Sequence, residues 1–202
     1  MTIRKETKTF TVYKFEDLSE EGKEKALQQE RGATNESMNL DFTIEESIED
    51  LKELGIEEPK IFYSGFNSQG DGACFEFCNI DFEKFLTKNK IKSKFKLLIK
   101  YQGAITFRGE QSGRYYHENS VDNFQEISSH LGCNDMHYSR VFDALEKQLE
   151  AFGEWFEGWR VEKCKEIYKD LENDNDYQLS DDNLKDNIIA NDYDFNQDGT
   201  TY

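Results

Sequence analysis

Two short polar segments contain the side chains best suited to binding or chemistry. The first is a glycine-rich run at residues 64–72 (SGFNSQGDG), which lies between two stretches that read as strands. Glycine permits positive φ, and successive amides in such a turn can form a concave anion site. The spacing matches neither of the phosphate-binding glycine fingerprints, so an ordinary turn is the alternative. The candidate contact residues here are Ser64, Ser68, Gln69 and Asp71.

The second segment is RYYHENS at residues 114–120, with Arg108 a few positions before it. It gathers two guanidinium groups, two phenols, an imidazole and a hydroxyl within thirteen positions. Such a set can bind phosphate and stack on bases. An amphipathic strand with one hydrated face is the simpler interpretation. The candidate binding residues are Arg108, Arg114, Tyr115 and His117.

The same segments do not predict an enzyme. His117 is of a type that can act as a general base, but no nucleophile with an orienting carboxylate stands at a diagnostic spacing. We therefore expect no catalytic residue and no cofactor, and we expect a protein that acts by binding.

A metal site is the next possibility to weigh. His130, Cys133 and His137 lie within eight residues, and Cys164 or Asp135 is available as a fourth ligand. The spacing is not that of a structural zinc site, in which paired cysteines are usually separated by two residues. The sequence therefore predicts no metal ion.

The charge of the chain is strongly negative and unevenly distributed. There are 25 basic and 42 acidic residues, for a net charge of -17. Residues 84–108 contain eight basic and no acidic residues, whereas residues 166–202 contain two basic and eleven acidic ones. Acidic segments repel a phosphate backbone and attract a basic partner, whose encounter they accelerate. We therefore expect a protein partner with a basic surface and no direct binding of nucleic acid, with simple solubility as the alternative.

The acidic end of the chain is the candidate docking element. Carboxylates placed along a helix and a tail can imitate the phosphate spacing of nucleic acid. The candidate docking residues are Asp174, Asp176, Asp181 and Asp182. A solvated surface with no partner is the alternative.

Cysteine usage and hydropathy indicate a compartment. The four cysteines stand in a chain whose start does not resemble a signal peptide, which is typical of free thiols in reducing cytosol. The longest apolar stretch, at residues 97–99, is far shorter than the roughly 20 residues of a membrane span. We expect a cytoplasmic protein that does not enter a membrane.

Periodicity and turn signals predict the elements that position these segments. Apolar residues recur every three or four positions from Val141 to Trp159, which indicates a long core helix. The Asn-Asp run at residues 173–176 is expected to end it. Strands are expected at residues 9–15, 60–63, 73–80, 103–108 and 114–117, the last extended by 119–127. Helices are expected at residues 20–31, 40–54, 81–86, 95–99, 139–171 and 181–190.

These elements predict an α+β fold. We expect an antiparallel sheet of about four strands with helices packed on one face and an acidic C-terminal helical extension. A chain of 202 residues can bury a core of useful size without disulfides or metals. The expected organisation is a single domain over residues 1–202, with residues 173–202 as the acidic extension.

The chain resembles a family of bacteriophage and prophage proteins commonly labelled antitoxin of a toxin-antitoxin stability system. The likeness covers most of the chain, and its SGFxSQGDGA segment is specific. It rests on residues 13–26 (YKFEDLSEEGKEKA), 61–76 (IFYSGFNSQGDGACFE), 113–121 (GRYYHENSV) and 177–199 (YQLSDDNLKDNIIANDYDFNQDG). The resemblance implies a phage accessory protein made in the host cytoplasm, and it supplies no catalytic residues.

Three functions fit these observations. The leading hypothesis is a phage protein that inhibits a bacterial defence system, of anti-CRISPR or anti-restriction type, by binding a basic surface of a host effector. One alternative is a binder that sequesters a nucleotide signal through the SQGDGA and RYYH segments. The other is an antitoxin that neutralises a partner toxin.

Overall fold

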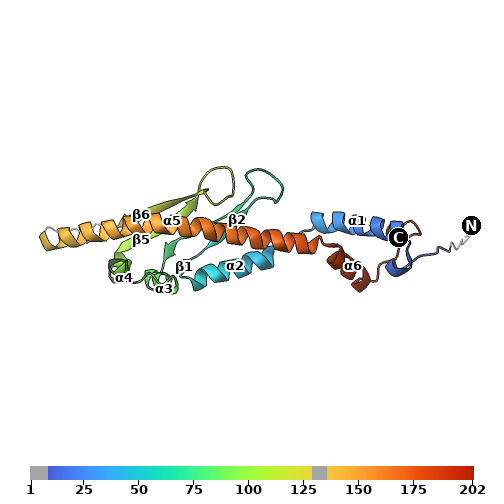
Figure 1. Ribbon diagram of the computed structural model, residues 1–202, viewed down its shortest axis with the longest axis horizontal. Coiled ribbons are helices and arrows are strands. Elements are labelled where there is room, and N and C mark those ends of the chain that lie inside the picture. The colour runs from blue at the N-terminus through green and yellow to red at the C-terminus, as the bar shows by residue number, and fades with distance from the viewer. Residues whose placement is uncertain (1–8, 129–135) are drawn as a thin grey trace, which may run out of the picture. The chain divides into compact units, whose positions relative to one another are not determined.

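The computed structural model describes residues 9–128 and 136–202 (Figure 1). The chain divides into two compact units, one made of Met1–Leu40 with Asn173–Tyr202 and the other of Asp41–Glu172. We call them the terminal unit and the central unit. Residues 173–202, which the sequence sets apart as an acidic extension, belong with the N-terminal residues in the terminal unit.

Two helices with side-chain caps form most of the terminal unit. Helix α1 (Glu20–Glu36) starts where the Ser19 side chain accepts the backbone N–H of Gly22 at 3.2 Å. Helix α6 (Asp181–Ala190) starts in the same way, where the Ser180 side chain accepts the backbone N–H of Asn183. Helix α1 continues past residue 31, where the sequence predicted its end, and includes Gly32. An exposed glycine costs a helix only about 1 kcal/mol relative to alanine, which the surrounding turns can offset.

The strand predicted at residues 9–15 does not form. Tyr13 and Phe195 exchange two backbone hydrogen bonds of 2.9 Å as an isolated bridge. Phe15 instead begins the short 3-10 helix η1 (Phe15–Asp17). β-branched and aromatic residues favour a strand only where a partner strand pairs with them, and here the pairing is one bridge long.

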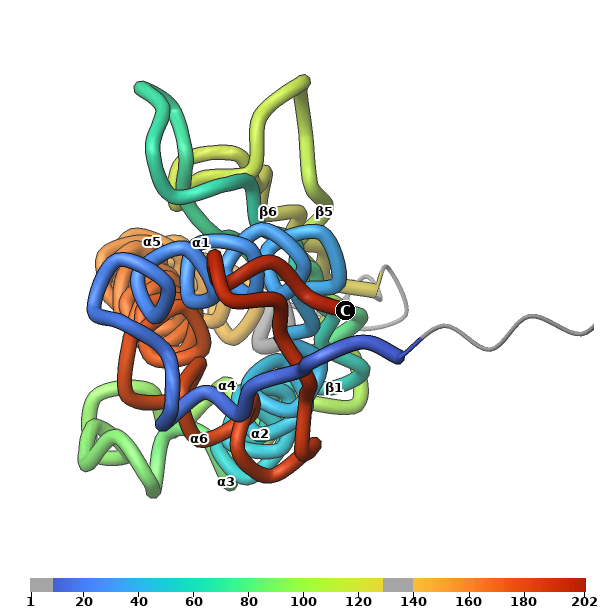
Figure 2. The backbone as a smooth tube through the Cα atoms, turned by 90° about the vertical axis from the view of Figure 1, so that its right-hand side faces the viewer, coloured from blue at the N-terminus to red at the C-terminus, as the bar shows by residue number. Residues whose placement is uncertain are grey.

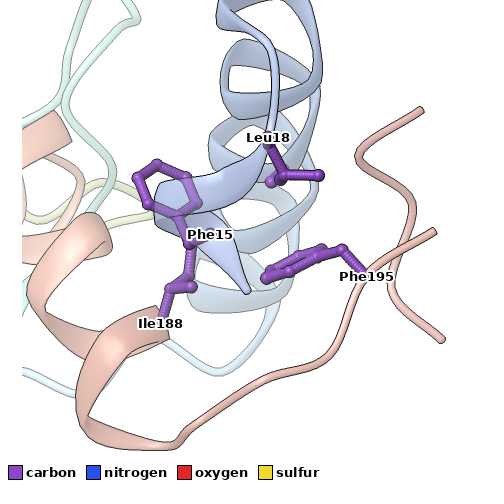
Figure 3. Packing of buried hydrophobic residues seen from close by; sticks show 5 residues of the cluster. Phe15, Leu18, Ile188 and Phe195 are labelled. Atoms are coloured by element: carbon purple, nitrogen blue, oxygen red, sulfur yellow. The ribbon is translucent and has the colours of Figure 1, made fainter. Parts of the chain in front are cut away.

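The core of the terminal unit joins residues from both ends of the chain (Figure 3). Phe15, Leu18 and Ala26 come from the N-terminal part, and Ile188 and Phe195 come from the C-terminal part. Phe15 and Phe195 meet edge to face, with ring centroids 6.4 Å apart. Burial of these side chains is the main source of stability that this small unit has.

The central unit combines helices with antiparallel strands, so the α+β class is confirmed. Its helices are α2 (Asp41–Glu53), α3 (Phe82–Lys88), α4 (Lys96–Lys100), the 3-10 helix η2 (Gln102–Ala104) and the larger part of α5 (Met136–Gln178). Its strands are β1 (Ile56–Glu57), β2 (Lys60–Tyr63), β3 (Ala73–Glu76), β4 (Asn79–Ile80), β5 (Ile105–Gln111) and β6 (Val121–Ile127).

The predicted sheet of about four strands is wrong. Within the described residues the strands form three separate antiparallel pairs, β1 with β4, β2 with β3 and β5 with β6. A single bridge joins β5 to the residue that follows β3, because Phe77 and Gly109 exchange backbone hydrogen bonds of 3.0 and 3.1 Å. A Cβ on Gly109 would overlap the Phe77 ring, so this approach requires glycine.

On both sides of that bridge, side-chain oxygens accept backbone N–H groups of β5 that the carbonyls of a neighbouring strand would accept in a continuous sheet. The Glu76 carboxylate accepts the backbone N–H of Gln111 at 3.1 Å. The Asn79 side-chain oxygen accepts the backbone N–H of Phe107 at 3.3 Å. Strand β5 therefore satisfies these donors without a continuous backbone ladder, and the four-stranded sheet does not form.

Helix α5 is longer than predicted. The Asn-Asp run at residues 173–176 does not end it, and the helix continues to Gln178. The Gln178 side-chain amide donates to the Asp174 carboxylate at 3.0 Å and to the Asn39 carbonyl at 2.9 Å. Asn and Asp have only moderately low helix propensity, so local hydrogen bonds of this kind allow the helix to continue.

Aromatic rings from α5 form the centre of the core of the central unit. Phe152 and Phe156 are fully buried, and each ring lies 5.2 Å from that of Phe107 on β5. Phe82 and Phe85 of α3 pack against the same helix. The apolar periodicity at residues 139–171 therefore marked the core face correctly. None of the helices in the described part of the chain is long and apolar enough to span a membrane.

Candidate functional site

Two loops protrude side by side from the central unit (Figures 1 and 2). The first tip, residues 64–72, joins β2 to β3 and carries the SQGDG run. The second tip, residues 112–120, joins β5 to β6 and carries the RYYH run. The sequence predicted residues 114–117 as a strand, and this is wrong. The strand pairing ends with Gln111 opposite Val121, so residues 112–120 form the connecting loop.

Asp71 organises the first tip from within. Its carboxylate accepts the backbone N–H groups of Asn67 at 2.9 Å and Ser68 at 2.6 Å. These are amides that a bound anion would need in a nest, and here the chain's own carboxylate occupies them. Asp71 is therefore a structural residue of the loop, whereas Ser68 and Gln69 are exposed.

His117 organises the second tip in a similar way. Its Nδ1 atom accepts the backbone N–H of Asn119 at 3.1 Å, and its carbonyl accepts the N–H of Ser120 at 2.9 Å. The imidazole thus has a role inside the loop. Arg114 and Tyr115 are exposed on the same loop, and the Tyr115 side chain is 59% accessible.

The two tips contact one another and form one surface. The Phe62 and Tyr116 rings stack with their centroids 5.4 Å apart. The Ser64 hydroxyl donates a long hydrogen bond of 3.5 Å to the Tyr116 carbonyl. Gly72 lies so close to the second tip that a Cβ on it would be 2.8 Å from the Cβ of His117. The structure therefore unites two segments that are about 45 residues apart in sequence.

Helix α5 holds the first tip in place. The Tyr168 hydroxyl donates to the Gly65 carbonyl at 3.0 Å, and its ring lies 5.6 Å from that of Phe66. Burial raises the pKa of Tyr168, and the carboxylates of Asp71 and Glu172 add to this effect. The phenol therefore stays protonated and remains a hydrogen-bond donor well above neutral pH.

Arg160 of α5 holds the base of the second tip, and the sequence reasoning missed it. Its side chain is 0% exposed. It donates to the carbonyls of Glu118 at 2.9 Å and Val121 at 3.2 Å, and it pairs with Glu157 on the same helix. The available signal was an arginine on the face of α5 that the apolar periodicity marks as core, three residues after a glutamate.

The structure does not bring Arg108 into the tip surface. Arg108 lies within β5, where its guanidinium is 5.2 Å from the Phe124 ring and 3.4 Å from the Glu110 carboxylate. Among the predicted binding residues, Ser64, Asp71 and His117 have structural roles in the loops. The exposed residues that remain for an outside contact are Ser68, Gln69, Arg114 and Tyr115.

The predicted acidic docking residues lie in the terminal unit with different surroundings. Asp181 forms an ion pair with Arg31, whose Nε also donates to the Leu179 carbonyl at 3.3 Å. Asp174 accepts from Gln178, as described above. Asp176 and Asp182 are exposed. The predicted surface is therefore partly neutralised within the protein itself.

A larger acidic surface lies between α1 and α6. An open groove of about 960 Å³ has five carboxylates on its walls. We call it the acidic groove, and its carboxylates are Glu16, Glu20, Glu21, Glu24 and Asp181. Three basic side chains, from Lys23, Arg31 and Lys185, lie among them, and Phe15 and Leu27 supply apolar surface. The glutamates of α1 were not predicted, because the pairing of α1 with α6 is a long-range contact.

The described part of the chain holds no cluster of metal-ligand side chains, and two of its cysteines are buried. Among the side chains that the structure describes, no group of three or more His, Cys, Asp or Glu is placed to hold a metal ion, and His130, Cys133, Asp135 and the side chain of His137 lie outside them. Burial raises the pKa of Cys74 to about 11 and that of Cys164 to about 12. Both are therefore protonated thiols at neutral pH, and thiols are poor nucleophiles.

A family comparison covers most of the chain. Residues 40–181 match the model of a family described as Domain of unknown function (DUF8835). No curated protein and no solved structure matches the chain. The matched range contains both tips and Arg160, and it excludes the glutamates of α1. Because the match extends over more than half of the sequence, the chain belongs to the DUF8835 family.

Proposed function

We propose that this protein acts by binding a basic surface of a protein partner through the acidic groove. In this proposal it is a phage-encoded accessory protein that inhibits a bacterial defence effector, of anti-CRISPR or anti-restriction type. The observation that supports it is the meeting of five carboxylates in one groove, four from the start of the chain and one from near its end.

The composition of the terminal unit supports the same proposal. Residues 1–40 and 173–202 together contain 16 acidic and 8 basic residues. Lysine and arginine side chains can lay their aliphatic stems on apolar surface while their charged ends reach carboxylates. The acidic groove offers both, since Phe15 and Leu27 lie among its carboxylates. An effector that handles nucleic acid has a basic surface, and a protein bound there excludes the nucleic acid.

Neutralising the groove is expected to weaken partner capture. In the variant Glu20→Gln, Glu21→Gln, Glu24→Gln, the loss of three exposed charge pairs at about 0.5 kcal/mol each predicts roughly tenfold lower affinity. The measurement is capture from host lysate by the tagged protein at low salt, quantified by mass spectrometry. Raising the salt concentration should release the partner from the wild-type protein, because the contact is electrostatic.

Two controls make this test specific. The variant Glu45→Gln, Glu46→Gln, Glu53→Gln removes three exposed carboxylates from α2 and reaches the same net charge, and it should capture the partner normally. Arg114→Ala removes the exposed guanidinium of the tips and should also leave capture unchanged. Equal losses in the groove and α2 variants would show that only net charge matters and would contradict the proposal.

An antitoxin would use the same groove. The two roles differ in the partner, which the capture experiment identifies as a toxin or as a defence effector. A toxin gene next to the gene for this protein would favour the antitoxin.

The tip surface supports a second candidate, a binder of a nucleotide signal. The observation that favours it is the contact between the two tips, which places Arg114 and Tyr115 on the same surface as Ser68 and Gln69. A guanidinium can bind a phosphate group and a phenol ring can stack on a base. The loop amides that Asp71 occupies do not contribute, so phosphate binding would depend on Arg114.

A further inference from the structure

A row of lysines lies on the surface of the central unit between α3 and α4. Residues 84–100 contain seven lysines and no acidic residue, in a chain whose net charge is -17. Every second residue from 88 to 96 is a lysine, and all five are exposed. We call these five the lysine row: Lys88, Lys90, Lys92, Lys94 and Lys96.

The residues between the lysines fix this segment to the core. The Ile91 N–H donates to the Leu86 carbonyl at 3.0 Å, and the Asn89 side chain donates to the Phe85 carbonyl at 2.9 Å. Phe95 is buried, with its ring 5.5 Å from that of Phe152. The lysines therefore lie exposed on an ordered segment of turns that is anchored at the end of α3 and at Phe95.

Most of these lysines form no ion pair with the described residues. Within the described residues, Lys92 pairs with Glu83 at 2.9 Å, and the other four members of the row form no ion pair. Elsewhere in the described chain, most basic side chains form an ion pair with a carboxylate. They are Lys14, Lys23, Lys25, Arg31, Lys52, Arg108, Arg160, Lys163, Lys165 and Lys169. Crowded like charges destabilise a fold, so the row is not explained by stability.

Lys90 adds a separate observation about the backbone. Its φ is +60°, in the left-handed region that glycine and asparagine adopt more readily than lysine. The local backbone thus favours another residue at this position. The presence of lysine points to a role for its side chain.

We propose that the lysine row binds the phosphate backbone of nucleic acid without reading its bases. Lysine offers a hydrated point charge, which suits contact with a repeating line of phosphates. Protein interfaces are instead depleted in lysine and centred on exposed aromatic or apolar anchors. None of the large apolar residues of this segment is exposed: Phe85, Leu86, Phe95 and Leu98 are buried, and Ile91, Leu97 and Ile99 are half-buried. The surface therefore fits a polyanion better than an acidic protein.

This inference revises the expectation of no direct nucleic-acid contact, which came from the charge of the whole chain. Charges are screened over about 8 Å at physiological ionic strength, so the acidic segments do not cancel the row at contact distance. They do weaken the overall attraction. We expect a dissociation constant on the order of 10⁻⁵ M at low salt, within the range of non-specific binding.

Fluorescence anisotropy with a short labelled DNA duplex of mixed sequence tests the proposal. If four or five phosphates are neutralised, the logarithm of the binding constant should fall with the logarithm of salt at a slope of about -4. The variant Lys90→Gln, Lys94→Gln, Lys96→Gln should bind at least tenfold more weakly, with a slope reduced by about 2 to 3. A single-stranded RNA of the same length should show the same dependence on the row, because the contact is to phosphate.

A matched variant distinguishes the effect of losing the lysine row from the effect of changing the net charge. Lys52→Gln, Lys165→Gln, Lys169→Gln removes three lysines that already have carboxylate partners and reaches the same net charge, so its binding should stay within about twofold of wild type. No binding by the wild-type protein at the lowest salt would overturn the proposal. Equal losses of nucleic-acid binding in both variants would also overturn it. The same holds for a result in which the lysine row mediates self-association or binding to anionic vesicles while neither nucleic acid binds.

Discussion

Replacing Arg160 with alanine is expected to lower the free energy of unfolding of the central unit by about 3 to 5 kcal/mol. The guanidinium is fully buried and satisfies two carbonyls, those of Glu118 and Val121, besides its pairing with Glu157. The substitution leaves both carbonyls without this donor and opens a cavity beside α5. Unsatisfied buried groups and cavities are among the few causes of losses of this size.

Urea unfolding followed by tryptophan fluorescence measures this change. The only two tryptophans, Trp155 and Trp159, lie on α5 in the central unit, so their emission reports on that unit. Lys163→Ala is the matched control on the same helix, since it removes a cation whose partner Glu166 is exposed, and it should cost about 0.5 kcal/mol or less. A loss for Arg160→Ala no larger than the control's would show that the buried arginine does not hold the second tip.

Gly72→Ala is expected to separate the two tips and to cost about 1 to 3 kcal/mol. The added Cβ would lie 2.8 Å from the Cβ and 2.9 Å from the Cα of His117. These atoms are close to the backbone, so a side-chain rotation cannot relieve the contact. The second tip must therefore move away from the first, and the stacking of Phe62 on Tyr116 should be lost.

Amide hydrogen exchange in the second tip measures that separation. The Ser120 N–H, which donates to the His117 carbonyl, should exchange faster in Gly72→Ala than in wild type. Gly65→Ala is the control in the same loop, because its added Cβ would meet only the Asp71 carboxylate, at 3.4 Å. If the two variants exchange alike in the second tip, the close approach of Gly72 and His117 is not what joins the loops.

Elements with local signals could be predicted from the sequence. Strand β2 and helix α6 form at the predicted residues, and Ser19, Asp81 and Ser180 cap the helices that begin directly after them. A cap or a strand of β-favouring residues is encoded within a few positions of itself. The sheet could not be predicted in this way, because it depends on Glu76 and Asn79 accepting hydrogen bonds from a strand about 30 residues away.

For the candidate sites too, the sequence predicted local features and missed long-range contacts. The SQGDG and RYYH runs were identified by composition, but their contact through Gly72 and His117 joins segments that no local pattern connects. Asp71 and His117 were predicted as ligand contacts, and the structure adds that both bond to the backbone of their own loops, which no local pattern indicated. The acidic groove was missed because it requires knowing that α1 lies against α6.

The range of the family match makes the choice between the two surfaces important. Residues 40–181 include both tips, whereas four of the five carboxylates of the acidic groove lie before residue 40. A partner that binds the groove would therefore be recognised largely by residues outside the matched range. A ligand of the tips would be recognised within it.

Hydrogen exchange of the protein with and without its captured partner tests the central claim most directly. Our account predicts slower exchange in α1 from residue 20 to residue 31 and at the start of α6, with the tips unchanged. Protection confined to residues 64–72 and 112–120, with α1 and α6 exchanging as in the free protein, would contradict it and assign partner binding to the tip surface.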